Sequence, residues 1–262
     1  MNLLKEFALK QTDAAVHLLD EYVKTNDGEA LHQLRVSIKK IRSVLRYFEN
    51  QQLHEKKIKQ LKKQLRHVFQ SAGFIRETQL QIQWLKRNRY RILLNESLLE
   101  TDVSFYEQVF LDEAGKSRKI LESIRKELNK FCKDADELSV FNYAEQLKQR
   151  IFFQLKSVNM SGWHELRKII KQLLYAQNWL SESEKIKLLP VKQTAFLDQL
   201  QEAIGNWHDA EDLKTWLSDE QFFLRTESNI KSQFNRCWQT QLKEIADKEG
   251  IIRKLLIKSP AV

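Results

Sequence analysis

Apolar residues recur at intervals of three and four along most of the chain, which is the spacing of an amphipathic α-helix. Between residues 29 and 49, for example, Leu34, Ile38 and Leu45 fall on one side of a helical wheel. A strand would need strict alternation, and no stretch keeps it for long enough. The pattern predicts an all-α protein with helices over about residues 3–24, 29–49, 54–72, 74–94, 102–131, 138–157, 162–181, 190–204, a segment after Gly205, and 220–248.

The breaks between these helices are marked by few residues, since the chain has only six glycines and two prolines in 262 residues. Such a composition favours long helices with short connections. Asp27 and Gly28 mark the first break. Ser161 is expected to cap the helix predicted over residues 162–181. Gly73 and Gly205 each follow an apolar run, so both are predicted to be C-caps that end a helix.

The second predicted helix places its cations on one narrow ridge. At 100° per residue, five of its polar side chains fall within an arc of about 80°. They are His32, Arg35, Lys39, Arg42 and Arg46. The third predicted helix has a comparable ridge of Lys56, Lys59, Lys63 and Arg66. Because each helix is apolar on its opposite face, packing the two side by side would line one groove with both ridges.

Part of this pattern returns 132 residues further along the chain. The matching pairs, first copy before second, are His32 and His164, Arg35 and Arg167, Lys39 and Lys171, and Gly73 and Gly205. Pairs that share one offset indicate a duplicated unit. The prediction is a single domain over 1–262, with a first repeat over 1–132 and a second over 133–262. Because Leu174 stands where the first copy has Arg42, we expect the first repeat to bind an anion more tightly.

Charge is distributed unevenly along the chain, whose net charge is +9. Residues 31–92 contain 16 lysines and arginines against three glutamates, so this segment carries +13 and the remainder carries −4. A surface that interleaves acids with bases would be more stable, because like charges repel. A segment that almost excludes acids therefore indicates a polyanionic partner.

Four sequence strings resemble a known family. HQLRVSIKKIRSVLRYF and LRHVFQSAGFIRETQLQIQWL in the first copy, with HELRKIIKQLLYAQNWL and LDQLQEAIGNWHDAEDLKTWL in the second, resemble the CHAD family, the conserved-histidine α-helical domain. The resemblance covers about residues 25–220. It implies two tandem four-helix-bundle repeats with pseudo-two-fold symmetry packed around a basic central groove, plus additional long helices. It also implies that inorganic polyphosphate binds in that groove.

The family's recurrent histidine matches His32 and His164, and its recurrent basic positions match residues on both predicted ridges. The complete set of expected polyphosphate-binding residues is His32, Arg35, Lys39, Arg42, Arg46, Lys56, Lys59, Lys63, Arg66, Arg76, His164, Arg167 and Lys171. Two roles stay open. The histidines either contact the ligand or pack near helix starts, and Arg76 either contacts the ligand or pairs with Glu77, as His208 would pair with Asp209.

Two other functions fit parts of the sequence. A basic helical protein could bind RNA or DNA, which would at least compete as polyanions. A metal-dependent phosphohydrolase would use a His-Asp dyad such as His208-Asp209, but the first copy has Arg76 and Glu77 there. No glycine-rich phosphate loop is present. We therefore expect a binding protein without catalytic residues, metal ligands or cofactor.

The cellular setting follows from the same features. The chain has no run of 18 apolar residues, so no membrane partner is expected. The two cysteines are isolated, which is typical of reduced thiols. We expect a cytoplasmic protein that associates with polyphosphate granules, and no feature predicts its oligomeric state.

Overall fold

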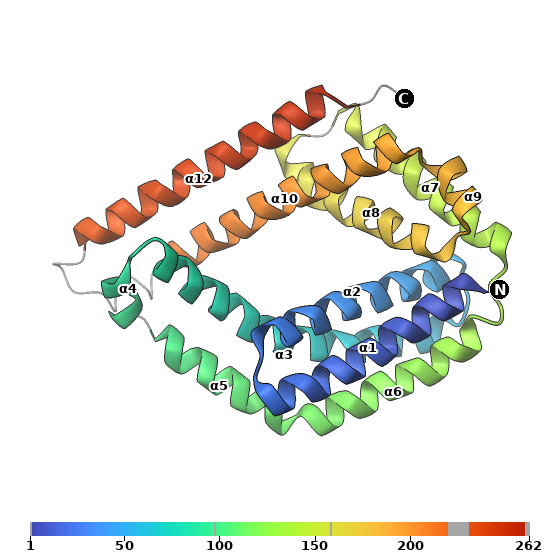
Figure 1. The fold of residues 1–262 in the computed structure, drawn as a ribbon, viewed down its shortest axis with the longest axis horizontal. Helices are drawn as coiled ribbons and strands as arrows, with labels where there is room; N and C mark the ends of the chain where they lie inside the picture. Colours follow the sequence, from blue (N-terminus) through green and yellow to red (C-terminus); the bar gives the residue numbers. More distant parts are fainter. Residues whose placement is uncertain (1, 97, 158, 220–230, 260–262) are drawn as a thin grey trace. The chain divides into compact units, whose positions relative to one another are not determined.

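The computed structural model describes residues 2–96, 98–157, 159–219 and 231–259, and in these ranges every regular element is a helix (Figure 1). The prediction of an all-α protein is confirmed. The α-helices are α1 (Leu3–Thr25), α2 (Gly28–Asn50), α3 (Glu55–Arg87), α4 (Arg91–Glu96), α5 (Leu99–Asp112), α6 (Ala114–Phe131), α7 (Glu137–Leu155), α8 (Trp163–Ala176), α9 (Glu182–Leu188), α10 (Val191–Leu217) and α12 (Lys231–Ile257). Two short 3₁₀ helices, η1 (Met160–Gly162) and η2 (Gln177–Trp179), flank α8.

The first connection shows how local chemistry sets the helix ends. Asn26 adopts a left-handed conformation with φ of 52°, and its N–H donates to the Tyr22 carbonyl, which terminates α1. The Asp27 carboxylate then accepts from the N–H groups of Glu29 and Ala30, which are otherwise unpaired at the start of α2. The break predicted at Asp27 is therefore an N-cap.

The two glycines predicted to be C-caps lie inside helices instead. α3 runs through Gly73 to Arg87, and α10 runs through Gly205 to Leu217, so the predicted stops at 72 and 204 are wrong. A C-cap glycine takes a positive φ, and no glycine of the described chain does so. Each glycine instead leaves room for an arginine side chain of a neighbouring helix.

Other predicted boundaries also shift. The helix expected over 102–131 is divided into α5 and α6 at Glu113. The helix expected over 162–181 ends at Ala176 and continues as η2. Ser161 lies within η1, whose cap is Asn159. The last helix extends to Ile257, beyond the predicted end at 248, and residues 220–230 of that prediction lie outside the described ranges.

The chain forms two compact units whose segments alternate along the sequence. Unit 1 comprises Met1–Thr78, Val103–Gln146 and Tyr175–Leu188. Unit 2 comprises Gln79–Asp102, Leu147–Leu174 and Leu189–Val262. These boundaries differ from the predicted halves 1–132 and 133–262. Units that pack compactly need not coincide with duplicated segments of sequence, so the two tandem repeats remain a prediction.

Unit 1 is built around α1, which packs against α2 and α6 (Figure 1). The apolar face predicted for the second helix is fully buried, from Leu34 to Phe48. An aromatic group adds to this core, with Tyr47 in edge contact with Tyr143 and with Trp179 of η2. The buried face fixes which way α2 is turned, so its cationic ridge is held on the opposite side.

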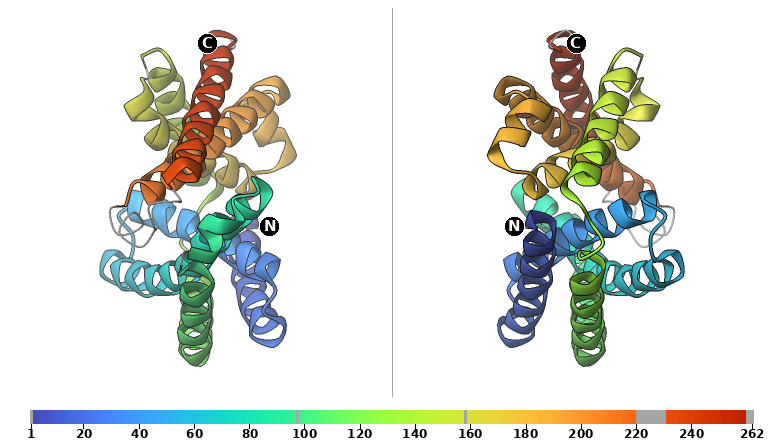
Figure 2. Two further views of the ribbon diagram at one scale, coloured as in Figure 1. Left: turned by 90° about the vertical axis from the view of Figure 1, so that its left-hand side faces the viewer. Right: turned by 90° about the vertical axis from the view of Figure 1, so that its right-hand side faces the viewer.

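Unit 2 is organised around α10, against which α12 packs (Figure 2). The buried side-chain amide of Gln241 on α12 donates to the Ala210 carbonyl of α10 at 2.6 Å. Trp163, at the start of α8, meets Trp207 of α10 edge to face with 5.2 Å between ring centroids. These contacts place α8 and α12 against α10 and so orient the polar side chains of α8.

Candidate anion-binding site

In unit 1, three cations of α2 converge on one aromatic ring of α3. The Arg35 guanidinium carbon lies 4.3 Å from the centroid of the Phe69 ring, the Arg42 guanidinium carbon lies 5.2 Å from it, and the Lys39 ammonium lies 5.8 Å from it. All three fall within the distance at which the negative face of the ring attracts a cation. We call Arg35, Lys39, Arg42 and Phe69 the Phe69 cluster.

Two further features hold Arg35 in this cluster. One is a hydrogen bond to α3, and the other is the lack of a side chain at Gly73. Arg35 Nη1 donates to the Phe69 carbonyl at 2.9 Å. A Cβ on Gly73 would collide with that same nitrogen and would lie 3.4 Å from the guanidinium carbon. Gly73 therefore lets the guanidinium approach the backbone of α3 closely, which explains a glycine in the middle of a helix. Burial lowers the pKa of Arg35, although a guanidinium remains charged at neutral pH.

Further predicted residues surround the cluster on both sides. Burial lowers the pKa of His32, and the positive charge of Arg76 lowers it further. At the other end, burial followed by repulsion from Arg46 and Arg66 lowers the pKa of Arg42. Mutual repulsion among cations destabilises a folded protein unless an anion relieves it. The structure thus brings the ridge of α2 together with Arg66 and Arg76 of α3.

The lysines at the start of α3 are placed less favourably for joining the Phe69 cluster. Lys56, Lys59 and Lys63 are exposed. At 100° per residue, Lys56 and Lys63 are turned about 140° and about 120° from Phe69, whereas Arg66 is only about 60° away. Lys62, which was not among the predicted residues, donates to both carboxylate oxygens of Glu49 at 2.8 and 2.7 Å. The start of α3 therefore offers dispersed charge, and the convergence lies nearer the middle of the helix.

Unit 2 repeats the half-buried arginine of unit 1. Arg167 of α8 donates from Nε to the Gln201 carbonyl of α10 at 3.2 Å. A Cβ on Gly205 would lie 2.7 Å from Arg167 Nη2 and 2.9 Å from Nε. Donor, acceptor and glycine each lie 132 positions after their counterparts in unit 1. The duplicated glycine is thus part of a duplicated contact between an arginine and a helix backbone.

The remaining polar groups of unit 2 differ from those of unit 1. The rings of His164 and His208 meet edge to face with centroids 4.4 Å apart. Burial lowers the pKa of His164, and the neighbouring His208 lowers it further. His208 Nδ1 lies 3.1 Å from Asp212, not paired with Asp209 as expected, and this hydrogen bond raises the pKa of His208.

Acidic groups also approach the lysine of the second copy. Burial and then Arg167 lower the pKa of Lys171, whereas Asp209 and Asp198 raise it. Asp198 stands 132 positions after Arg66, so a cation of unit 1 corresponds to an anion in unit 2. Gln201 likewise replaces Phe69. The second copy keeps the arginine contact but offers a less positive surface.

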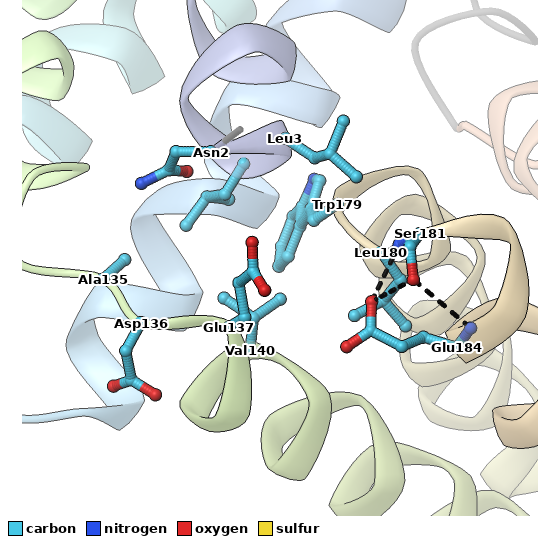
Figure 3. A pocket seen from close by; sticks show the side chains of 11 residues that line it. Asn2, Leu3, Ala135, Asp136, Glu137, Val140, Trp179, Leu180, Ser181 and Glu184 are labelled. Atoms are coloured by element: carbon cyan, nitrogen blue, oxygen red, sulfur yellow. Dashed lines mark hydrogen bonds between the residues drawn. The ribbon is translucent and has the colours of Figure 1, made fainter.

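A pocket of about 190 Å³ in unit 1 lies elsewhere, among the starts of α1, α7 and α9 (Figure 3). Three carboxylates line it, from Asp136, Glu137 and Glu184. Glu184 accepts from the N–H and the hydroxyl of Ser181 at 2.8 and 2.6 Å, so it caps α9 (Figure 3). An acidic lining repels anions, so this pocket is not the predicted site.

Within residues 2–96, 98–157, 159–219 and 231–259, no three side chains of His, Cys, Asp or Glu lie together as metal ligands. Over the same part of the chain, no helix is both long enough and apolar enough to cross a bilayer.

A family model described as CHAD domain matches residues 7–218. The chain belongs to the CHAD domain family. No curated protein matches the sequence. Two solved structures share the fold at low sequence identity. PptA from Streptomyces chartreusis is similar with a TM-score of 0.72 and 15% identity, over 97% of each chain. The CHAD domain from the plant Ricinus communis is similar with a TM-score of 0.64 and 16% identity, over 97% of this chain and 91% of that one.

Two features of this CHAD domain were not predicted from its sequence. The apolar spacing of the third predicted helix places Phe69 on its buried face, opposite the ridge of lysines, yet the half-buried ring lies among the cations of α2. Gly73 and Gly205 were assigned no part in the site, yet each accommodates an arginine. One signal could have revealed the glycines, because both lie at a constant spacing from the duplicated arginine.

Proposed function

We propose that this CHAD domain binds inorganic polyphosphate without transforming it, and that the Phe69 cluster of unit 1 makes the strongest contribution. The observation that carries the proposal is the convergence of Arg35, Lys39 and Arg42 on one ring. A linear anion with a charge on each phosphate can satisfy several closely spaced cations at once. Arginine binds phosphate oxygens in a fork, and lysine binds them as a point charge.

The geometry favours polyphosphate over a single-stranded nucleic acid. Proteins that bind single strands without sequence preference usually offer aromatic rings on which bases stack. The ring in this site is already engaged by a guanidinium 4.3 Å from its centroid. It therefore supports cations and is not presented as a platform for a base. Polyphosphate has no bases and needs only the cations.

The contributions of the proposed residues differ between the two copies. In unit 1, we assign direct contacts to the cations of the Phe69 cluster and to Arg46 and Arg66, with Arg76 beside them and His32 in support. In unit 2, Arg167 and Lys171 make weaker contacts, with His164 in support, because Asp198 and Asp209 both approach Lys171. Lys56, Lys59 and Lys63 add a general attraction for anions. The central groove expected between two repeats stays a prediction from the family resemblance.

The test compares variants that remove the same charge from different helices. Lys39→Gln with Arg42→Gln removes two cations of the cluster, and Lys119→Gln with Lys126→Gln removes two exposed cations of α6. Affinity for polyphosphate of defined length is measured by calorimetry at two salt concentrations. We expect the first pair to weaken binding about tenfold or more and to reduce the salt slope by about 1.4, as the loss of two contacts to a single-stranded polyanion would.

The control pair should change the affinity less than about twofold, since exposed charges are screened by salt. Equal losses from both pairs would show that net charge alone attracts the ligand, which would refute the assigned site. Lys171→Gln provides the comparison for the second copy and should weaken binding less than Lys39→Gln does.

Two further measurements separate the alternatives. Polyphosphate should displace bound RNA at matched charge and salt, whereas a true RNA-binding protein would retain the RNA. Phosphate release, with and without divalent metal, should stay at the level of the buffer if the protein is not a hydrolase. The expected location with polyphosphate in the cytoplasm stays a prediction, to be checked by imaging the tagged protein together with the polymer.

A further inference from the structure

The ring of Phe69 gathers three cations of α2 although it carries no net charge. Its face attracts Arg35, Lys39 and Arg42 through the negative potential of the π-system. A carboxylate at the same place would also attract the cations, but it would cancel one of their three positive charges. An aromatic ring orders the cations and leaves the positive charge for an anionic ligand.

Residue 69 also holds Arg35 through its backbone. The Phe69 carbonyl accepts from Arg35 Nη1 at 2.9 Å while the guanidinium carbon lies 4.3 Å from the ring centroid. The guanidinium is therefore fixed by two groups of one residue, and Gly73 leaves room for it one turn further along α3. Such a fixed cation loses less conformational entropy when it binds a phosphate than a mobile one would.

The second copy serves as an internal comparison. Gln201 occupies the position of Phe69, and its carbonyl still accepts from Arg167, at 3.2 Å. The backbone contact is thus kept without an aromatic ring. Each copy has one acid at matching positions, with Glu77 near Arg35 and Asp209 near Lys171. The copy without the ring adds Asp198, which stands at the position of Arg66 and also approaches Lys171. The aromatic side chain is therefore not required for the arginine contact, and it accompanies the more cationic copy.

From these contacts, we infer that Phe69 is a positioning residue of the polyanion site, whose ring pre-orders Arg35, Lys39 and Arg42 for successive phosphates of one chain. The inference rests on the proposed function, because it assigns a role within that same site. It predicts that polyphosphate affinity depends on the electrostatic potential of the ring and not only on its volume.

The experiment varies that potential at constant shape. Phe69 is replaced by 3,4,5-trifluorophenylalanine, which fills nearly the same space with little negative potential on its face. Phe69→Leu removes the ring, Phe69→Trp keeps a ring with a stronger attraction for cations, and Gln201→Leu is the matched control in the second copy. Affinity for polyphosphate of defined length is measured for each protein, together with its melting temperature.

We expect the fluorinated variant and Phe69→Leu to bind about three- to tenfold more weakly, which is the range that cation–π contacts of this kind can supply. Phe69→Trp should bind within about twofold of the unmodified protein. Gln201→Leu should lower the affinity less than Phe69→Leu does, because the Gln201 side chain donates to Asp198 and gathers none of the cations of the Phe69 cluster. Unchanged affinity in the fluorinated variant would overturn the inference. So would a loss in Phe69→Trp as large as that in Phe69→Leu, because that result would indicate a packing role.

A spectroscopic readout distinguishes failure of the inference from failure of the proposed function. The Nε–H signals of Arg35 and Arg42 in ¹H–¹⁵N spectra should be shifted by the ring current of Phe69 and should move toward unperturbed positions in Phe69→Leu. If these signals move as expected while affinity stays constant, the inference is overturned and polyphosphate binding stands. If the unmodified protein does not bind polyphosphate, the proposed function fails, and the inference fails with it.

Discussion

Gly73 provides a sharp test of how the site is built, because alanine is normally the better residue inside a helix. Replacing an interior glycine by alanine stabilises a helix by about 1 kcal/mol. At Gly73 the new Cβ would collide with the Arg35 guanidinium. Gly250 of α12 has no atom within 4 Å of the corresponding Cβ, so Gly250→Ala is the matched control. The two variants make the same chemical change in different surroundings.

The expected difference can be estimated from the contact that is lost. Displacing the guanidinium removes its hydrogen bond to the Phe69 carbonyl, and a hydrogen bond to a charged group contributes about 1.5–3 kcal/mol. The end of an arginine is flexible and regains part of this by turning to water. We therefore expect Gly73→Ala to be about 1–2 kcal/mol less stable than Gly250→Ala, and neutral to about 1 kcal/mol less stable than the unmodified protein.

Urea unfolding followed by far-ultraviolet circular dichroism measures both free energies of unfolding. Polyphosphate affinity, measured on the same samples, should fall for Gly73→Ala and stay constant for Gly250→Ala. Gly205→Ala should behave like Gly73→Ala, since its Cβ would lie 2.7 Å from Arg167 Nη2. If Gly73→Ala gains as much stability as Gly250→Ala, close approach of the arginine is not the reason for the glycine, and the argument is refuted.

Three further predictions concern protonation. The hydrogen bond to Asp212 raises the pKa of His208. This interaction should stabilise the folded protein by about 0.5 kcal/mol below pH 6.5, and the stabilisation should be lost as the pH rises through the raised pKa. Urea unfolding across this range should show the loss, and the pH dependence should be absent in His208→Gln. Burial raises the pKa values of Cys132 and Cys237 to about 12, so iodoacetamide at pH 8 should label them only after unfolding, and rapid labelling of the native protein would contradict their burial. Burial and Arg76 lower the pKa of His32. Because a bound polyanion favours the protonated ring, binding should take up protons and should tighten as the pH falls below about 6.5. Calorimetry should find this effect reduced in His32→Gln.

Much of the fold could be predicted because helical periodicity is local. The buried face of α2 agrees with the apolar positions of its sequence, since a helix that must bury one side repeats its apolar residues every three to four positions. Helix boundaries were less predictable at Gly73 and Gly205. A glycine after an apolar run is equally compatible with a C-cap and with close packing, and only the neighbouring helix distinguishes the two.

The candidate site was likewise predictable only in part. The sequence by itself determined that Arg35, Lys39 and Arg42 share one side of a helix, because their spacing follows from helix geometry alone. One constant offset between the copies also matched the arginines and the glycines, but the contact between them became visible only in the structure. Only the tertiary structure decided that Phe69 lies among these cations and not in the core, and that Asp198 and Asp209 both approach Lys171 in the second copy. Those outcomes depend on how one helix is rotated against another, which is set by side-chain packing between segments distant in sequence.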